Sequence, residues 1–503
     1  MFNQSPVIAY LIVLTIEFVI LRIRIKGIRF LIYTLMVFII LSSLWLVIST
    51  GWLSYLILFL IIYRIINLFR KIRDNSKNNY FNKLIINSNN RLILLQIFLL
   101  ACLYVININH INFSYVISFL SIITLTTVVF INIITSKNIR STKQTNIDTH
   151  YYDRELPTVS VLIPARNETE DLEECLLSLI ESDYPKLEIL VLDDCSQNKK
   201  TSDIIKNYAH DGVRFLQGKI PPDDWLAKNY AYQQLYNEAN GDILLFCGVD
   251  VRFSKYSIRS MIEIMLDQKF DMISLIPRNI YKNYSSIKSL IYQPSRYAFE
   301  VSLPRFYFNK PPVLSTCWLI YHKELTTCGQ FMAVKHKVTP ESYFAKKVWK
   351  KDHKYKLIHS NRTIGLSSFK PSEEQFLTAI RTYYPKLHHK IDLVGFVTLG
   401  YFLIFLSPII FFLYSLIIFN IINLMISIAT ILLLIILYGQ LIYLTFDKII
   451  TKAIGLIFVA VIFDIIIYNL SMLKYEFGSV YWKERNICLP VMHIETTLPK
   501  INH

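Results

Sequence analysis

The sequence predicts an α/β domain inserted between two groups of membrane-spanning helices, and three observations lead to this fold class. Three apolar strands, at 158–164, 187–192 and 242–246, alternate with segments of helical period. Each strand ends abruptly at polar or acidic residues. Long apolar runs lie on both sides of this region, in a chain of 503 residues that is 53% hydrophobic. Continuous apolar strands favour a parallel sheet covered on both faces, with ligands at the carboxyl ends of the strands.

Apolar runs long enough to cross a bilayer occur five times before the α/β region and three times after it. Their approximate limits are 8–21, 30–49, 53–69, 92–108, 113–134, 393–419, 424–445 and 454–470. The first run could be a signal peptide, but no small-residue cleavage site precedes Arg22, so we interpret it as a retained span.

Basic residues set the expected orientation. They cluster at 22–29, 70–73 and 137–143, after the first, third and fifth runs, whereas the intervening connections carry none. The positive-inside rule therefore predicts a multi-pass protein of the cell membrane with its α/β domain in the cytoplasm. A net charge of +16 then suits the anionic inner leaflet better than a nucleic acid, and we expect no nucleic-acid partner.

Four motifs in the α/β region resemble those of glycosyltransferase family 2, in order and in spacing. They lie at 161–168, 191–196, 224–229 and 246–251. The likeness is greatest to membrane-bound carotenoid (diaponeurosporenoate) and hopene-associated glycosyltransferases, which also carry a C-terminal Trp-Lys-Gly-Arg segment, matched here by Trp-Lys-Glu-Arg at 482–485. This resemblance covers 157–387 and the C-terminal part of the chain. It implies a GT-A-like, Rossmann-like domain that moves a hexose from a nucleotide-diphosphate sugar to a membrane lipid or lipid-linked acceptor, with inversion.

The resemblance also implies a nucleotide-sugar site at the strand ends. Its expected residues are Pro164, Arg166, Glu168, Asp193, Asp194, Trp225, Lys228 and Asp250. Asp193 and Asp194 match an acidic pair that in the family contacts the uracil or ribose, and Lys228 would supply a cation with Trp225 packed beside it.

A divalent metal, Mg²⁺ or Mn²⁺, is the expected cofactor, because the leaving diphosphate needs its charge neutralised. Asp250 matches the last Asp of the family's Asp-x-Asp motif and is the expected metal ligand. Gly248 stands where the first Asp would be and should weaken the metal site. Restoring a carboxylate with Gly248→Asp should tighten the metal requirement without disturbing the fold.

Glu341 is the best match for the catalytic base of the family, in the segment 338–345. A Pro followed by Glu is equally a generic helix start, so both interpretations stay open. The Gln-x-x-Arg-Trp signature of processive synthases is absent, which disfavours a polysaccharide synthase. A membrane scaffold that kept the fold and lost part of its metal site is the other alternative.

We expect four regions: a five-span membrane region at 1–136, the glycosyltransferase domain at 150–390, transmembrane helices at 391–473 and a tail at 474–503. Three C-terminal spans would place Trp482 and Arg485 opposite the domain, so one run could be re-entrant, interfacial or a hairpin. Aromatic and basic residues downstream of Asp250 could shape an acceptor groove or merely anchor the domain at the interface. They are Arg296, Tyr297, Arg305, Tyr307 and Trp318. The sequence names neither the sugar nor the acceptor.

Overall fold

The structure, a computed structural model, describes most of the chain. The described residues are 5–22, 28–50, 55–73, 79–108, 113–143, 151–279, 291, 297–298, 300–303, 311–352, 354–446 and 454–488.

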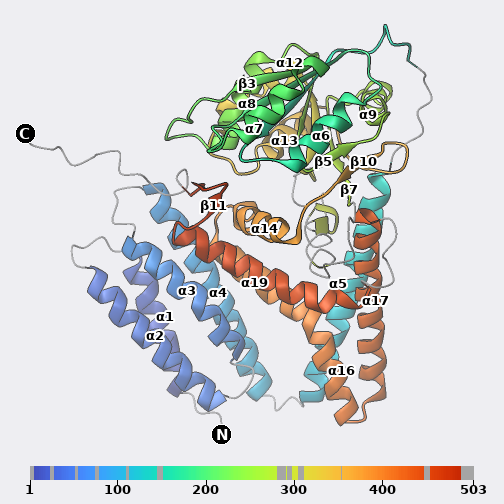
Figure 1. Ribbon diagram of the computed structural model, residues 1–503. Coiled ribbons are helices and arrows are strands. Elements are labelled where there is room, and N and C mark those ends of the chain that lie inside the picture. Colours follow the sequence, from blue (N-terminus) through green and yellow to red (C-terminus); the bar gives the residue numbers. More distant parts are fainter. Residues whose placement is uncertain are drawn as a thin grey trace, which may run out of the picture. The chain divides into compact units, whose positions relative to one another are not determined.

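Long apolar helices precede and follow the α/β domain (Figure 1). The first group is α1 (Ser5–Ile20), α2 (Ile28–Thr50), α3 (Tyr55–Arg73), α4 (Asn79–Ile108) and α5 (Phe113–Ser141). The second group is α15 (Ile391–Tyr401), a π-helical turn (Phe402–Leu406), α16 (Ser407–Ile417), α17 (Ile421–Thr445) and α19 (Ile457–Glu476). Among the described helices, six segments are long and apolar enough to cross a membrane. This order of elements along the chain confirms the predicted α/β domain flanked by apolar helices.

The chain forms two compact units. The first comprises Met1–Thr126, Lys386–Ile431 and Tyr468–Glu476, and the second comprises Thr127–Pro385, Leu432–Ile467 and Phe477–His503. Ion pairs join the N-terminal helices of the first unit to its later segments: Arg91 Nε lies 2.6 Å from Asp392 Oδ2, and Arg70 Nε lies 2.8 Å from Glu476 Oε2. Helices outside the family resemblance therefore pack with helices inside it.

The second unit is built on a seven-stranded sheet in the order β3-β2-β1-β4-β8-β6-β9. The strands are β1 (Val159–Ala165), β2 (Leu187–Asp193), β3 (Val213–Gln217), β4 (Ile243–Cys247), β6 (Met272–Ile276), β8 (Cys317–Tyr321) and β9 (Tyr355–His359). The three strands predicted from the sequence are β1, β2 and β4. These three strands run parallel, as predicted, but the complete sheet is mixed, because β8 runs antiparallel to both β4 and β6. The connection after β6 brings the chain back to the carboxyl edge, so β8 begins beside Cys247, where the parallel strands end.

Helices cover both faces of this sheet, as predicted. They are α6 (Glu170–Ile180), α7 (Lys200–Asn207), α8 (Ala227–Glu238), α9 (Ser257–Asp267), α12 (His322–Thr327) and α13 (Glu341–Asp352). One apolar core joins the sheet to α6 and α9, and a second joins it to α8 and α13. These two cores hold the strand ends rigid, which is what a site built on loops requires.

Smaller elements complete the domain. A three-stranded sheet contains β5 (Val251–Phe253), β10 (Leu366–Ser368) and β7 (Arg278–Asn279), helix α14 (Ser372–Lys386) follows it, and a terminal hairpin is formed by β11 (Tyr481–Trp482) and β12 (Arg485–Asn486).

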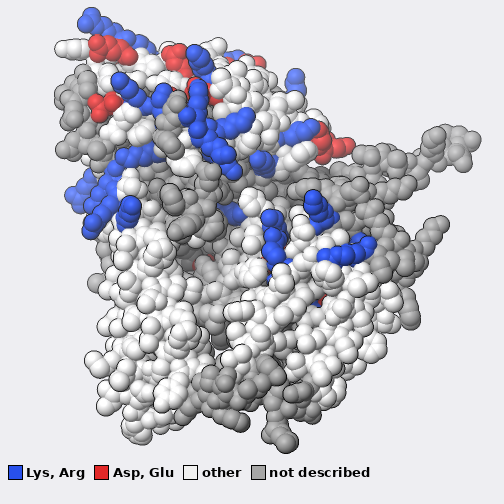
Figure 2. All heavy atoms as spheres, turned by 180° about the vertical axis from the view of Figure 1, so that it is seen from behind, with Lys and Arg blue, Asp and Glu red and all other residues white. Residues whose placement is uncertain are grey.

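Trp318 lies in the core. It is 1% exposed on β8 and stacks on Phe246 with ring centroids 4.1 Å apart. The expectation that Trp318 faces an acceptor groove is therefore wrong, because its strand is internal to the sheet. Tyr297 is also buried, and Arg296, Arg305 and Tyr307 lie outside the described residues. Figure 2 shows that Lys and Arg gather on the α/β domain, while the described surface of the long helices is mostly uncharged.

Candidate functional site

Two loops at the carboxyl ends of β1 and β2 form the base of the site. Asn167 and Cys195 adopt left-handed backbone conformations, with φ of 50° and 52°, which turn the chain sharply after each strand. Asp193 Oδ1 accepts a hydrogen bond from the Ser196 amide at 2.9 Å, and Ser196 Oγ accepts one from the Asn167 amide at 3.0 Å. Asp193 therefore shapes its own turn and ties the two loops together.

Asp194 is the most deeply buried acid of this edge, with 1% of its surface exposed. Its Oδ2 pairs with Arg485 Nη1 at 2.7 Å. Its Oδ1 is buried and has no hydrogen-bond partner among the described residues. Burial raises the pKa of Asp194, and the Arg485 guanidinium opposes that rise. A buried carboxylate oxygen without a donor is costly, unless a ligand supplies the donor.

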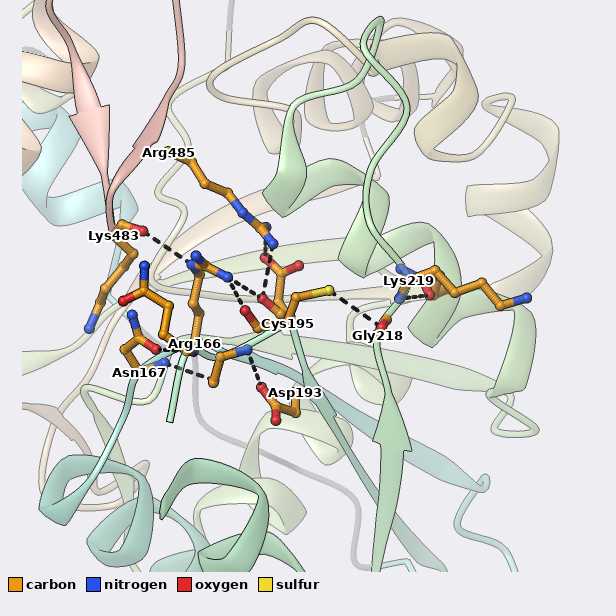
Figure 3. A network of polar contacts seen from close by, with 12 residues as sticks. Arg166, Asn167, Asp193, Cys195, Gly218, Lys219, Lys483 and Arg485 are labelled. Carbon is orange, nitrogen blue, oxygen red and sulfur yellow. Dashed lines mark hydrogen bonds and ion pairs between the residues drawn. The ribbon is translucent and has the colours of Figure 1, made fainter. Parts of the chain in front are cut away.

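Arg166 connects the two loops to the terminal hairpin (Figure 3). Its Nη1 donates to the carbonyl oxygen of Asp194 at 2.8 Å and also to that of Cys195, and its Nε donates to the carbonyl oxygen of Lys483 at 3.1 Å. Burial lowers the pKa of Arg166, and the neighbouring Arg485 adds to this effect. Arg166 thus works here as a backbone clamp.

Glu168 lies at the other end of the same loop. Burial raises the pKa of this carboxyl group, although Lys483 Nζ lies 3.1 Å from its Oε1 and lowers it. The hairpin therefore contributes one cation to Asp194, through Arg485, and another to Glu168, through Lys483.

A pocket of about 240 Å³ adjoins these loops. Residues that were predicted for the site and line the pocket are Pro164, Glu168, Lys228 and Asp250. Other polar and aromatic residues that the sequence analysis did not assign to the site also line the pocket: Ser315, Thr316, Lys370, Glu374, Thr378, Arg381, Trp482 and Lys483. Acidic and cationic groups thus share one cavity, as a site for a charged, phosphorylated ligand requires.

The remaining predicted residues lie beside the pocket. Trp225 packs edge-on against Tyr230 with ring centroids 5.5 Å apart and borders the core under α8. Glu341 is the first residue of α13 and is 3% exposed, while Val338 and Thr339 just before it do line the pocket. Neither Trp225 nor Glu341 is part of the pocket lining.

Asp250 is the carboxylate best placed for a metal. Its Oδ2 lies 3.4 Å from Ser368 Oγ. The described residues hold no cluster of three or more His, Cys, Asp or Glu that could bind a metal by itself. Asp250 would thus hold Mg²⁺ or Mn²⁺ together with substrate phosphate oxygens, a usual arrangement for Mg²⁺.

The sequence expectation for position 248 needs correction. A Cβ on Gly248 would lie 2.5 Å from Asp250 Oδ1. Gly248→Asp therefore forces the Asp250 carboxylate to move, so it does not simply restore a second metal ligand.

The terminal hairpin is the part of the site that the sequence analysis left undecided. The match of 482–485 to Trp-Lys-Gly-Arg was its only signal, and membrane anchoring explained Trp482 equally well. Because Arg485 pairs with Asp194, the hairpin lies against the strand-end loops. All three C-terminal apolar segments, Ile391–Ile417, Ile421–Thr445 and Ile457–Glu476, are long and apolar enough to cross a membrane.

The strand-end loops and the charged pocket thus lie at the carboxyl edge of the sheet, the edge at which open α/β sheets generally bind their ligands. Residues 160–328 match the family described as "Glycosyl transferase family 2", the family that the motifs resemble.

Curated relatives agree with this assignment over part of their length. Over 121 residues the chain is 33% identical to the "Probable glycosyltransferase YdaM" of Bacillus subtilis (strain 168), covering 23% of this chain and 28% of that protein. Over 136 residues it is 28% identical to the "4,4'-diaponeurosporenoate glycosyltransferase" of Staphylococcus haemolyticus (strain JCSC1435), covering 26% of this chain and 36% of that protein. The match thus spans about a third of the length of these relatives.

Among solved structures, a mannosyltransferase from Pyrobaculum calidifontis, PcManGT, in complex with GDP-Man and Mn²⁺, aligns with 69% of this chain and 98% of its own chain. Its identity to this chain is 15% and the TM-score is 0.41.

Proposed function

We propose that the protein is an inverting glycosyltransferase that moves a sugar from a nucleotide-diphosphate donor to a membrane lipid or lipid-linked acceptor. The observation that carries the proposal is the buried Asp194 Oδ1, unpaired within the described part of the chain, beside a pocket lined by Lys228, Lys483 and Asp250. An acceptor atom for a base would then lie on the strand-end loops, outside the pocket lining, and the cations for a diphosphate would lie in the pocket. The proposed domain limits remain 1–136, 150–390, 391–473 and 474–503.

The nucleotide base would bind at the ends of β1 and β2. Asp194 Oδ1 can accept a hydrogen bond from a ring N–H of the base, which would satisfy the carboxylate oxygen to which none of the described residues donates. The Arg166 clamp fixes the backbone on which this oxygen is carried.

The diphosphate would lie between Lys228, Lys483 and Asp250. A divalent metal held by Asp250 would supply Lewis-acid stabilisation of the leaving diphosphate. The two lysines share the same task directly, because ammonium groups bind phosphate oxygens as point charges. Thr316, at the start of β8, belongs to the same lining and closes the pocket on the side of β4.

The acceptor hydroxyl or carboxylate would enter along α14, which contributes Glu374, Thr378 and Arg381 to the pocket lining. Glu341 is the proposed base if the acceptor must lose a proton, and its burial would keep it poised for that step. The basic clusters of the N-terminal region support a cytoplasmic site and a membrane partner.

A non-catalytic scaffold is the second candidate, since Gly248 removes one carboxylate of the Asp-x-Asp motif. Binding of nucleotides to the purified full chain separates the two. The transferase must bind one nucleoside diphosphate and transfer its sugar, and Asp250→Ala must abolish transfer. A protein that binds no nucleoside diphosphate, or an Asp250→Ala protein that still transfers at the normal rate, would contradict the proposal.

A further inference from the structure

The terminal hairpin, residues Tyr481–Asn486, is here called the C-terminal strap. It contacts both loops of the donor edge, although it follows them by roughly 290 to 320 residues in the chain. Arg485 Nη1 binds Asp194 Oδ2 at 2.7 Å, and Arg485 Nη2 donates to the Asp194 carbonyl oxygen at 3.1 Å. Trp482 and Lys483 of the same strap line the pocket.

Arg485 leaves Asp194 only half satisfied. Of the two carboxylate oxygens, Oδ2 is held by the guanidinium, whereas Oδ1 is buried and has no partner within the described ranges. A single ring N–H flanked by carbonyl groups, as in uracil, needs one such oxygen with guanidinium donors nearby. A pair of adjacent N–H donors, as in guanine, would need both oxygens of the carboxylate. The strap thereby reduces Asp194 to a one-oxygen acceptor.

Lys483 occupies the phosphate side of the same strap. Its ammonium group pairs with Glu168 at 3.1 Å and lies in the pocket lining with Lys228 and Asp250. A diphosphate entering this pocket would offer Lys483 a more highly charged partner than Glu168. The exchange of partners would draw the strap onto the bound donor.

The turn of the strap is strained. Lys483 and Glu484 both have positive φ, 45° and 67°, as in the two-residue turns that favour Asn and Gly. Glu484 is exposed. The pairing of β11 with β12 imposes this conformation, and the contacts of Lys483 and Arg485 to the donor site add to it.

We propose that the C-terminal strap is a closing element of the donor site, with Arg485 positioning Asp194 for a uracil-type base and Lys483 binding the donor diphosphate. This inference rests on the proposed function. It adds a base preference and a structural element to that function, and it couples donor binding to the polypeptide that directly follows helix α19.

Two substitutions at the turn test the strap without touching its contacts. Glycine suits φ of 67° and proline cannot adopt it, so Glu484→Gly and Glu484→Pro should act in opposite directions at one exposed position. In the full-length protein, titrated with UDP, Glu484→Gly should bind about two- to fivefold more tightly than wild type, and Glu484→Pro should bind at least about tenfold more weakly. Equal affinity in all three proteins would overturn the proposal.

Substitutions of Arg485 and Lys483, the two residues of the strap that contact the donor edge, provide a second test. Arg485→Ala and Lys483→Ala should each weaken UDP binding by about 10- to 100-fold, while Arg485→Lys should restore only part of the loss because it lacks the planar fork. Lys219→Ala is the matched control, since Lys219 is an exposed lysine of the neighbouring loop (Figure 3) and should bind UDP as wild type does. Unchanged thermal unfolding of the variants shows that the loss is local.

The preference for a uracil-type base is tested separately, by comparing the binding of UDP and GDP. Wild type should bind UDP at least about tenfold more tightly than GDP, and Arg485→Ala should narrow that difference. Tighter binding of GDP would overturn the base assignment. Failure of wild type to bind any nucleoside diphosphate would instead overturn the proposed function itself, whereas normal binding that is indifferent to Glu484, Lys483 and Arg485 would overturn the strap alone.

Discussion

A buried arginine–carboxylate pair in the helical unit and another in the α/β unit differ in how completely the carboxylate is satisfied. In the helical unit, Arg64 contacts both oxygens of Glu17, and Asn89 donates to Glu17 Oε1 at 2.6 Å. In the α/β unit, Arg485 holds one oxygen of Asp194, and the other has no donor within the described ranges of the chain.

The guanidinium of the helical pair is satisfied as well. Tyr10 and Gln96 accept hydrogen bonds from Arg64 Nη1 at 2.8 and 2.6 Å. Residues of α3 and α4 thus satisfy both carboxylate oxygens of Glu17 on α1, whereas Asn89 Oδ1 is buried without a hydrogen-bond partner among the described residues.

This difference distinguishes a structural pair from a binding site. Both pairs carry the cost of burying charges, which is recovered only when the remaining hydrogen-bonding groups are also satisfied. The Asp194 network stays open at one atom, which is tolerable where a ligand completes it.

The largest expected effect concerns a third buried carboxylate, Glu341. If it acts as the base, Glu341→Gln should lower the transfer rate by about 10²–10⁴-fold with nucleotide affinity nearly unchanged. If it only begins helix α13, the amide would lose a small dipole interaction and turnover would stay near normal. Single-turnover transfer and nucleotide titration on the same preparation measure both quantities. Full activity would remove Glu341 from the reaction and favour an acceptor that arrives already ionised.

Substitutions in the Arg64–Glu17 pair should change the stability of the protein. Arg64→Met leaves Glu17 buried without its cation, and we expect a loss of about 3–5 kcal/mol in the free energy of unfolding, measured as detergent-dependent thermal unfolding. The double variant Arg64→Met with Glu17→Gln should recover part of that loss. Nucleotide affinity of the folded fraction should not change. A stable Arg64→Met protein that has lost nucleotide binding would show that the comparison between the two pairs is wrong.

Substitutions in the Arg485–Asp194 pair should change the affinity for nucleotide. Asp194→Asn keeps the shape of the side chain and removes its charge, so the hydrogen bond to the base should weaken by about 1.5–3 kcal/mol, or roughly 10- to 150-fold in affinity. Unfolding temperature should change little, because Oδ1 accepts no hydrogen bond from the described protein. Asp193→Asn is the control on the neighbouring acid, whose Oδ1 accepts a turn hydrogen bond. Equal losses in both variants would contradict a special role for Asp194.

The smallest effect is a pH dependence. Burial raises the pKa of Asp194, so the folded protein takes up this proton at a higher pH than an unfolded chain does. As the pH rises from the pKa of Asp194 in the unfolded chain to its higher pKa in the folded protein, ionisation of this carboxyl group lowers the folding stability. Nucleotide binding needs the ionised oxygen, so the affinity for nucleotide weakens as the pH falls through the folded-state pKa. Because Arg485 lowers this pKa, Arg485→Met should shift the loss of affinity to higher pH. An unshifted pH profile would show that the guanidinium does not control the Asp194 charge.

Local patterns in the sequence determined much of the donor domain. The apolar strands, the polar residues that end them and the match to family 2 follow from short-range periodicity and motif order, which act within about ten or twenty residues. Pro164, Glu168, Lys228 and Asp250 could for this reason be assigned to one site from their motifs alone, and all four line one pocket.

Only the tertiary structure decided what those residues meet. The antiparallel insertion of β8, the burial of Trp318 and the pairing of Arg485 with Asp194 all join segments far apart in the chain. A sequence pattern carries no information on which of two distant charges will be brought together. That choice depends on how the packed layers place the strand ends. Among the described residues, this packing leaves Asp194 Oδ1 without a hydrogen-bond donor, whereas both carboxylate oxygens of Glu17 accept hydrogen bonds from Arg64.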